Sequence, residues 1–308
     1  MSYRPRLNKT EAKFLGLKLK FEKYEKGGRN PRYTIKKDLY NKLLEYRGSN
    51  IKKEGVKSAK ILVFDIETSP TKAYVWGKWK QNVNDCQLLD EWFMLTWSAK
   101  WLFKNEVLNA KLTPCEAINQ DDKRISQSIW KLLDEADILI GHNINKFDIK
   151  KLNTRFLIHG LPSPSSFLTI DTLVHARKSF AFHSNKLDFL AQKLGVGKKV
   201  NHAGFEMWAK CLEGDEDSLN KMSEYNDGDI FINEEVYLKI RPFIRPHPNL
   251  SLFIDTDNIV CPSCEHNELE YISEYATYAN IYSEYRCKRC GNRSRSNKAQ
   301  TKATPLPR

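Results

Sequence analysis

Two acidic side chains stand close together in the segment FDIETSP, where Asp65 and Glu67 follow an apolar run typical of a buried strand. Residues i and i+2 of a strand point to the same face, so the two carboxylates repel each other unless a cation compensates them. Carboxylate oxygens are ligands that suit Mg²⁺ or Mn²⁺. An Asp-x-Glu pair by itself is also typical of surface turns and helix caps, so further residues must decide its role.

Two later segments supply further acids. GHNINKFDIKKL places Asn143 five residues before Asp148, where a strand should give way to a helix. EYNDGDI places Tyr225 and Asp229 four residues apart, on one face of a helix. Structural alternatives exist, because Asn143 can cap the helix and an acid in a first helical turn is favourable without any function. Asp227, which lies off the Tyr225 face, competes with Asp229.

Four of the seven cysteines form two Cys-x-x-Cys pairs, in CPSC and CKRC. They are Cys261, Cys264, Cys287 and Cys290. Two such pairs can supply four thiolates in a tetrahedron, the closed arrangement of a structural Zn²⁺ site. The Tyr- and Ile-rich segment between them favours strands. The sequence therefore predicts a zinc ribbon. Its basic and aromatic residues could contact nucleic acid, and the alternatives are a protein-binding ribbon or a cap on the main domain.

The elements that must position the acids follow an α/β pattern. We expect strands near 60–66, 74–76, 92–100, 107–112, 137–141 and 167–171, and helices near 122–135, 147–158, 172–179, 186–194, 205–213 and 216–239. Strands first, then strand–helix alternation, then a helical end predict a mixed sheet flanked by helices. Asp171, just before the helix at 172–179, is expected to be its N-cap.

The chain is expected to have four parts. Residues 1–58 form a basic helical arm and linker, with helices near 10–26 and 35–47. Residues 59–250 form the α/β domain, 258–292 the zinc ribbon and 293–308 a disordered tail.

Charge is distributed unevenly along the chain. The formal net charge is +12, and the first 60 residues contain 18 Lys and Arg against 6 Asp and Glu. A basic arm attached to a domain that collects carboxylates favours binding to a polyanion, although a solvated lysine-rich surface is the alternative. The longest early apolar run is far too short to span a membrane, and the N-terminus lacks the apolar core of a secretory signal. We therefore expect a cytoplasmic protein without a membrane partner.

Taken together, the three acidic segments resemble the three motifs of DnaQ-like (DEDD) exonucleases, which have an RNase H-like fold. The similarity is closest to the proofreading domains of family B DNA polymerases and their free-standing, phage-type relatives. It spans about residues 59–240 and rests on the order Asp-Ile-Glu, Asn-x4-Asp and Tyr-x3-Asp. Some relatives carry His five residues before the last Asp. Glu224 occupies that position here, so the chain resembles the tyrosine subclass.

The resemblance implies a role for each acid. Asp65, Glu67 and Asp229 would hold one Mg²⁺ or Mn²⁺ ion, and Asp65 would also reach a second. Asp148 would support the site through water or the second ion, and Tyr225 would orient the attacking water. A tyrosine with its usual pKa near 10 is a poor base at neutral pH, which agrees with a positioning role.

Substrate contacts are implied as well. Asn143 and Phe147 match positions that contact the terminal nucleotides. His142, beside the second motif, is a weaker candidate contact.

These observations predict a 3′→5′ exonuclease that degrades single-stranded or frayed DNA with two Mg²⁺ or Mn²⁺ ions and one structural Zn²⁺. A ribonuclease acting on RNA 3′ ends is the alternative enzyme, and a non-catalytic zinc-containing nucleic-acid-binding factor is the alternative of another class. A separate polymerase or a replication or repair protein is a possible partner. A bacterial or phage-infected cell is the expected setting.

Overall fold

The computed structural model describes residues 58–197, 204–256 and 258–300, and only isolated positions before residue 58. The chain divides into two units, Met1–Lys57 and Ser58–Arg308. In the first unit, β1 (Ser2–Tyr3) pairs antiparallel with β2 (Ile35–Lys36). The prediction that a helix begins at residue 35 is therefore wrong at its start, where the β-branched Ile35 joins a strand. Most of the two predicted helices, and the linker after them, lie outside the described residues.

A five-stranded mixed sheet forms the centre of the second unit. Its strands are β3 (Ile61–Thr68), β6 (Met94–Trp101), β7 (Leu108–Lys111), β8 (Ile138–Gly141) and β9 (Leu168–Asp171). They lie in the order β7-β6-β3-β8-β9. β3, β6 and β7 pair antiparallel, whereas β3, β8 and β9 pair parallel. The predicted mixed sheet is confirmed, with β3, the strand that carries the first acidic pair, at its centre.

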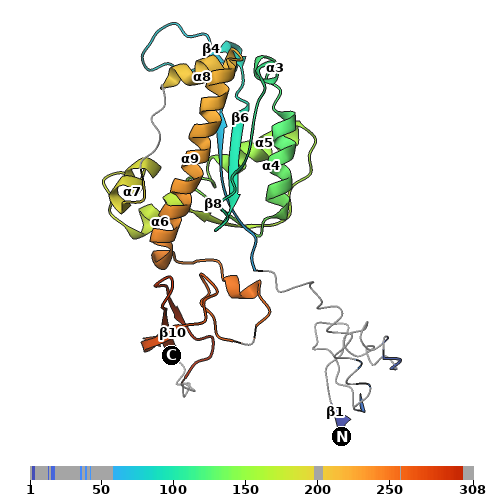
Figure 1. The fold of residues 1–308 in the computed structure, drawn as a ribbon, viewed down its shortest axis with the longest axis vertical. Coiled ribbons are helices and arrows are strands. Elements are labelled where there is room, and N and C mark those ends of the chain that lie inside the picture. The colour runs from blue at the N-terminus through green and yellow to red at the C-terminus, as the bar shows by residue number, and fades with distance from the viewer. Residues whose placement is uncertain are drawn as a thin grey trace. The chain divides into compact units, whose positions relative to one another are not determined.

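Seven helices of the described residues surround this sheet. They are α3 (Pro114–Ile118), α4 (Lys123–Glu135), α5 (Asp148–Ile158), α6 (Thr172–Ser179), α7 (Leu187–Leu194), α8 (Phe205–Leu212) and α9 (Glu216–Ile240). In Figure 1, the long α9 runs along the sheet, with α4 and α5 on the other side. The helices predicted from 122 onward are confirmed to within about two residues, whereas α3 was not predicted.

The two faces of β3 pack into different cores. Leu62 and Phe64 pack with α4 and α5, whereas Ile61 and Val63 pack with the later turns of α9. Because side chains alternate along a strand, the acids at positions 65 and 67 continue the face that is turned toward α9. The same strand therefore supplies apolar packing at its start and carboxylates at its end.

A short hairpin leaves the body directly after β3. β4 (Lys72–Ala73) pairs antiparallel with β5 (Leu88–Asp90), and the short 3₁₀ helix η1 (Asp85–Gln87) precedes β5. The strand predicted at 74–76 is wrong, because the ladder stops at Ala73 and the following residues have no partner strand. They form an exposed loop instead.

The C-terminal part is a three-stranded antiparallel sheet of β10 (Leu269–Ala276), β11 (Ile281–Cys287) and β12 (Arg293–Arg295). The prediction that residues 293–308 form a disordered tail is wrong for its first half. After β12, the Ser296 amide donates to the Ser283 carbonyl and the Gln300 amide to the Ile281 carbonyl, both at 2.8 Å. These bonds continue the backbone pairing along the part of β11 that β12 leaves uncovered. Residues 301–308 lie outside the described part.

The ribbon packs against the chain that follows α9, where 3₁₀ helices η2 (Arg241–Phe243) and η3 (Leu250–Leu252) lie. The Arg245 guanidinium donates to the Asn292 side-chain oxygen at 2.6 Å and to the Arg293 carbonyl at 2.9 Å. The Leu250 amide donates to the Pro262 carbonyl at 2.7 Å. These contacts support the predicted alternative that the ribbon caps the main domain. Among the described residues, no helix combines the length and apolarity that a bilayer crossing requires.

A candidate active site of three carboxylates and a separate four-cysteine centre

Three of the four predicted acids converge in space. One carboxylate oxygen each of Asp65, Glu67 and Asp229 lies within 4.8 Å of the others. β3 supplies the first two from one face and α9 supplies the third. Three carboxylates this close are unfavourable without a positive charge, and their oxygens form a donor set suited to a hard divalent cation. The site therefore fits Mg²⁺ or Mn²⁺.

Asn226 links α9 to β3, the two elements that supply the clustered carboxylates. Its fully buried side-chain amide, on α9, donates a hydrogen bond to Asp65 Oδ2 at 2.9 Å. Sequence reasoning did not single out this residue. Its position three residues before Asp229 and next to Tyr225 places it on the site side of the helix, which is the signal that could have found it.

The different contacts of Asp227 and Asp229 show which of these two acids belongs to the cluster. Asp227 accepts hydrogen bonds from the Ser98 hydroxyl at 2.6 Å and from the Asn109 side-chain amide at 2.8 Å. It thus ties α9 to β6 and β7, whereas Asp229 joins the carboxylate cluster. Tyr225, partly exposed, lies one helical turn before Asp229, as predicted.

Asp148 stands apart from the three-acid cluster. It opens α5, its side chain is 1% exposed, and its Oδ1 accepts a hydrogen bond from the Ile66 amide at 3.2 Å. Burial raises the pKa of the Asp148 carboxyl to about 7, and the nearby negative charge of Asp171 adds to that rise. The residue is therefore held beside the strand that carries Asp65 and Glu67.

Asp171 organises the turn that precedes Asp148. It caps α6, accepting from the Leu173 and Val174 amides at 3.1 and 3.2 Å, so the predicted N-cap is confirmed. The same carboxylate also accepts from the backbone amides of Asn143 and Asn145 at 3.0 and 3.2 Å. One buried acid thus fixes both the start of α6 and the turn that follows β8.

Asn143 adopts a left-handed backbone conformation with φ 72°. Asparagine tolerates this region better than most residues, which explains the residue type in this turn. Phe147 immediately precedes α5 and occupies its N-cap position. The alternative in which Asn143 caps this helix is therefore wrong. The Asn143 side chain is partly exposed and remains a candidate substrate contact.

Lys151 contacts Thr68, Trp92 and Phe147, which together form the rim of the candidate site. Its ammonium donates to the Thr68 hydroxyl at 3.1 Å, lies 3.7 Å from the centre of the Trp92 ring and 4.9 Å from that of Phe147. Burial lowers the pKa of Lys151, while the charge of Asp148 opposes that shift. Phe147 is 39% exposed, so part of its side chain is accessible to a ligand. Neither the lysine nor Trp92 was predicted to belong to the site.

His142 has a structural role in the absence of substrate. Its Nδ1 lies 2.9 Å from the Thr172 hydroxyl and its Nε2 lies 2.9 Å from the Asn185 carbonyl. Both ring nitrogens thus join the end of β8 to neighbouring segments. A substrate contact by this ring remains a prediction.

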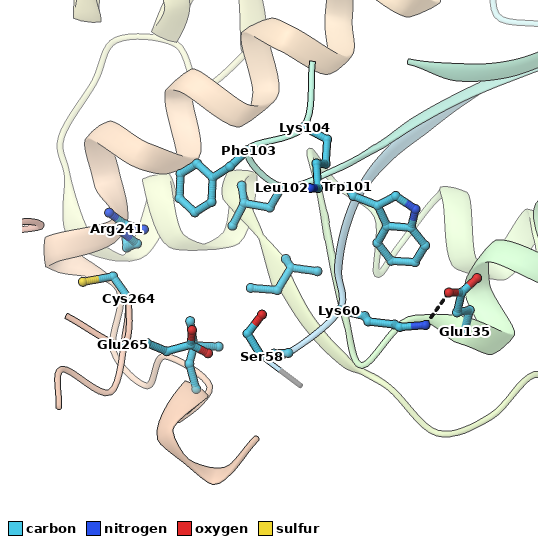
Figure 2. Close-up of a pocket in the computed structure, with 13 residues that line it drawn as sticks. Ser58, Lys60, Trp101, Leu102, Phe103, Lys104, Glu135, Arg241, Cys264 and Glu265 are labelled. Atoms are coloured by element: carbon cyan, nitrogen blue, oxygen red, sulfur yellow. Dashed lines mark hydrogen bonds and ion pairs between the residues drawn. The ribbon is translucent and has the colours of Figure 1, made fainter. Parts of the chain in front are cut away.

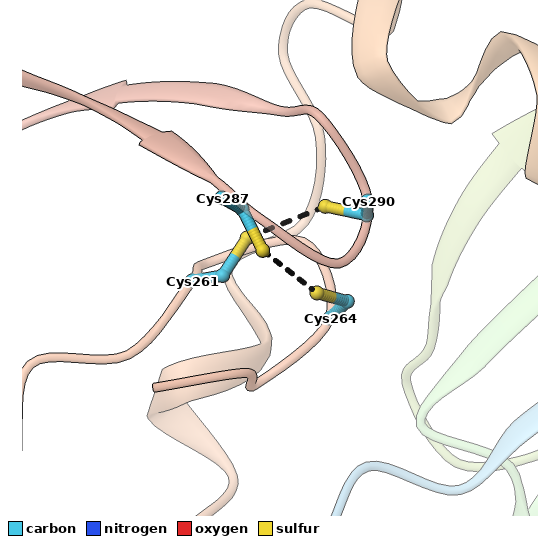
Figure 3. A group of neighbouring side chains, drawn as sticks. All are labelled: Cys261, Cys264, Cys287 and Cys290. Atoms are coloured by element: carbon cyan, nitrogen blue, oxygen red, sulfur yellow. Dashed lines mark hydrogen bonds between the residues drawn. The ribbon is translucent and has the colours of Figure 1, made fainter. Parts of the chain in front are cut away.

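The four cysteines converge as predicted (Figure 3). Cys261 and Cys290 have their sulfur atoms 3.6 Å apart, and so have Cys264 and Cys287. Four ligands at a Zn–S distance of about 2.3 Å in a tetrahedron are separated by about 3.8 Å, close to the observed spacing. All four thiols are reduced and nearly buried. Their hydrogen bonds lower the pKa of the Cys290 thiol, led by the bond from Cys261. The donor set fits a structural Zn²⁺.

A cavity of about 320 Å³ lies at the other end of β3 (Figure 2). It is lined by Ile61 and Phe103 of the body and by Cys264 and Glu265 of the ribbon, among others. At a strand rise of about 3.3 Å per residue, Ile61 is roughly 20 Å from Glu67 along β3. This cavity is therefore separate from the carboxylate cluster.

Comparison with known proteins shows that part of the chain is similar to a superfamily. Residues 105–240 match the family model described as RNase_H superfamily. This match begins after β3 and includes three of the predicted catalytic residues, Asp148, Tyr225 and Asp229, together with the predicted substrate contacts His142, Asn143 and Phe147. Residues 105–240 are therefore similar to the RNase H superfamily, and the mixed sheet flanked by helices is the RNase H-like arrangement that the acidic motifs predicted.

The chain also gives partial matches to solved structures. One is the family B DNA polymerase from the hyperthermophilic archaeon Pyrobaculum calidifontis, with a TM-score of 0.41 and 14% sequence identity. The similarity covers 73% of this chain and 34% of the polymerase chain, so this chain spans about a third of the polymerase. No curated protein sequence matches the chain.

The superfamily domain and the carboxylate cluster together indicate a nuclease. RNase H-like nucleases use divalent metal ions, and the three converging acids supply a suitable set of ligands. The chain thus combines a region similar to the RNase H superfamily, an acidic cluster whose donors suit a divalent cation, and a separate four-cysteine centre.

Proposed function

We propose that this protein is a metal-dependent 3′→5′ exonuclease that hydrolyses single-stranded or frayed DNA ends and releases nucleoside 5′-monophosphates. The observation that carries the proposal is the convergence of Asp65, Glu67 and Asp229 within 4.8 Å. The order of the acidic motifs supports the exonuclease class and its polarity. The basic N-terminal sequence favours a polyanionic substrate.

In this proposal, the three clustered carboxylates hold the first cation, and Asp65 with Asp148 supports a second. Bound cations would lower the pKa of a water molecule and stabilise the charge that develops on the leaving 3′ oxygen. Tyr225 positions the attacking water, one helical turn from Asp229. The water oxygen attacks phosphorus, the bond between phosphorus and the 3′ oxygen breaks, and the shortened strand receives a proton at its new 3′ hydroxyl.

The terminal nucleotide would be held by the rim of the site. The accessible part of the Phe147 side chain can stack on a base. Asn143, whose backbone Asp171 fixes, can reach a polar edge of the nucleotide. His142 would either hold this turn in position or contact the nucleotide directly.

A ribonuclease acting on RNA 3′ ends is the second candidate, because no described residue at the cluster is shown to recognise or exclude a 2′ hydroxyl. A non-catalytic zinc-containing nucleic-acid-binding factor is the candidate of another class. The converging carboxylates argue against it, because mutually repelling acids are costly to keep together without a cation. A separate polymerase or a replication or repair protein would be the partner of a proofreading role, and a cytoplasmic setting in a bacterial or phage-infected cell remains part of the proposal.

One assay tests the proposal and separates its alternatives. Oligonucleotides of DNA and of RNA, labelled at the 3′ or the 5′ end, are incubated with Mg²⁺, with Mn²⁺ or with no divalent cation. We expect a descending ladder from 5′-labelled single-stranded DNA and immediate release of the label from 3′-labelled DNA, in both cases only with a cation. Degradation of RNA alone would replace DNA as the substrate. No degradation of either polymer would leave the binding factor as the function.

A further inference from the structure

The loop between β4 and β5 exposes several large aromatic side chains. Trp76 is 99% exposed, Trp79 85% and Tyr74 71%. In Figure 1, this loop projects away from the sheet beside the label of β4. Tryptophan is highly buried on average in folded proteins, so two nearly fully exposed tryptophans three residues apart indicate a surface that binds something.

The base of this loop is closed by a defined set of hydrogen bonds. The Tyr74 amide donates to the Gln87 carbonyl at 2.9 Å, and the Gln87 side chain donates back to the Tyr74 carbonyl at 3.0 Å. Asn84 and Gln87 also form a capping box at η1. The aromatic residues are therefore presented on a loop with a fixed base.

The charged residues around the exposed aromatic side chains of the loop are all positive. Residues 69–84 contain Lys72, Lys78 and Lys80 and no Asp or Glu. Lys72 pairs with Asp90 at the base, at 3.4 Å, whereas Lys78 and Lys80 are exposed on either side of Trp79. Lysine is depleted in protein–protein interfaces. Exposed aromatic rings interleaved with lysines instead fit bases that stack and phosphates that pair with ammonium groups.

Both ends of the hairpin return to the candidate active site. One end leaves from Thr68, which follows Glu67, and the other reaches Trp92, two residues after β5. Lys151 contacts both ends, through the Thr68 hydroxyl at 3.1 Å and the Trp92 ring at 3.7 Å. The same ammonium lies 4.9 Å from the Phe147 ring centre. The loop is thus continuous with the rim at which the terminal nucleotide would bind.

We propose that the β4–β5 loop is an aromatic arm that stacks on bases of single-stranded DNA upstream of the 3′ end held at the carboxylates. This inference rests on the proposed function and names the part of the substrate that the arm holds. Nine residues separate Glu67 from Trp76, so Trp76 can lie at most about 30 Å from Glu67. In this proposal the arm holds nucleotides upstream of the terminal pair and does not contact a dinucleotide.

The first test measures binding without hydrolysis. Anisotropy of a labelled oligo-dT is followed in buffer without Mg²⁺ or Mn²⁺, with the zinc ribbon intact. Removing two stacking rings should weaken binding by at least about tenfold in the double variant Trp76→Ala/Trp79→Ala, whereas Trp76→Phe/Trp79→Phe should retain most of the affinity. Lys78→Gln/Lys80→Gln should reduce the slope of log affinity against log salt by roughly 1.4. The control is Leu157→Ala on α5, an exposed apolar residue (81%) remote in sequence from the loop, which should bind as wild type.

The second test uses the length of the substrate. For the Trp76→Ala/Trp79→Ala variant, we expect kcat/KM to fall on a 20-nucleotide strand and to stay unchanged on a dinucleotide. Unchanged affinity for oligo-dT in this variant would overturn the aromatic arm, whatever the enzyme's activity. A change of oligomeric state in place of a change of affinity would also overturn it and would identify the loop as a contact between copies. A failure of the exonuclease proposal would instead appear as absent hydrolysis with the binding difference intact.

Discussion

The side-chain amide of Asn226 donates a 2.9 Å hydrogen bond to Asp65, linking α9 to β3 at the carboxylate cluster. The bond orients one of the three clustered carboxylates and stabilises its ionised form. Residues that orient metal ligands typically contribute 10- to 100-fold in metal affinity or activity.

Asn226→Ala should therefore lower Mn²⁺ affinity by about tenfold or more, measured by titration calorimetry. The fold should persist, because the change removes a single side-chain amide from α9. Asn226→Asp places a fourth negative charge at the cluster and should alter affinity in a pH-dependent way. Wild-type affinity in the alanine variant would show that Asp65 needs no orientation by α9.

Asp229 and Asp227 provide a matched pair on the same helix. Asp229→Asn removes one of three converging carboxylates and should abolish cation-dependent degradation, as should Asp65→Asn. Asp227→Asn should keep cation binding, because Asp227 contacts Ser98 and Asn109 in place of the cluster. Hydrolysis of labelled DNA and cation binding are measured for each variant. The assignment fails if the Asp227 variant loses cation binding and the Asp229 variant retains it.

Tyr225→Phe removes a hydroxyl and keeps the ring. If Tyr225 positions water without accepting its proton, kcat should fall by about one to three orders of magnitude with KM little changed. The rate should keep the pH dependence of the wild type. A full loss of activity, equal to that of Asp229→Asn, would contradict a positioning role.

The raised pKa of Asp148 predicts how the free energy of unfolding depends on pH when no divalent cation is bound. Its folded-state pKa of about 7 lies above the ordinary value of 3.8, so between these values the folded protein holds a proton that the unfolded chain has released. The free energy of unfolding should therefore fall as pH rises from about 4 to about 7. One pKa unit corresponds to about 1.4 kcal/mol, so the decline should be a few kcal/mol at most.

Urea unfolding at pH 5 and pH 8 in Mg²⁺-free buffer measures this dependence. Asp148→Asn has no titrating carboxyl at this position and should be less sensitive to pH than the wild type. Equal pH sensitivity in both proteins would mean that other groups cause the decline.

Zinc removal should affect the ribbon before the body. The ribbon's buried cluster consists of its four cysteines, with Leu269 packed against them, so the metal must provide much of its stability. Cys287→Ser should lower zinc content, measured by elemental analysis, and should increase proteolysis within 258–300. The α/β body has its own core and should unfold separately at higher temperature. Unaltered protease resistance in a zinc-free variant would contradict the structural role.

The sequence by itself determined which residues are candidates to carry the chemistry. The apolar run before Asp65 and Glu67 predicted a buried strand, and the helical spacing of Tyr225 and Asp229 predicted one face of a late helix. The Cys-x-x-Cys pairs predicted the metal centre. Each is a local pattern, because two or four residues apart is enough to fix a shared face on a strand or a helix.

Only the tertiary structure decided which acids meet. Asp227 and Asp229 are both available on α9, and the packing of that helix on β6 and β3 directs one to Ser98 and the other to the cluster. The site's supporting contacts, such as Asn226 with Asp65, join residues 161 positions apart, which no local pattern encodes. The exposed loop after β4 likewise contains strand-forming residues, but it lacks a partner strand. Local spacing fixes the face on which a side chain lies, whereas long-range packing determines what that face meets.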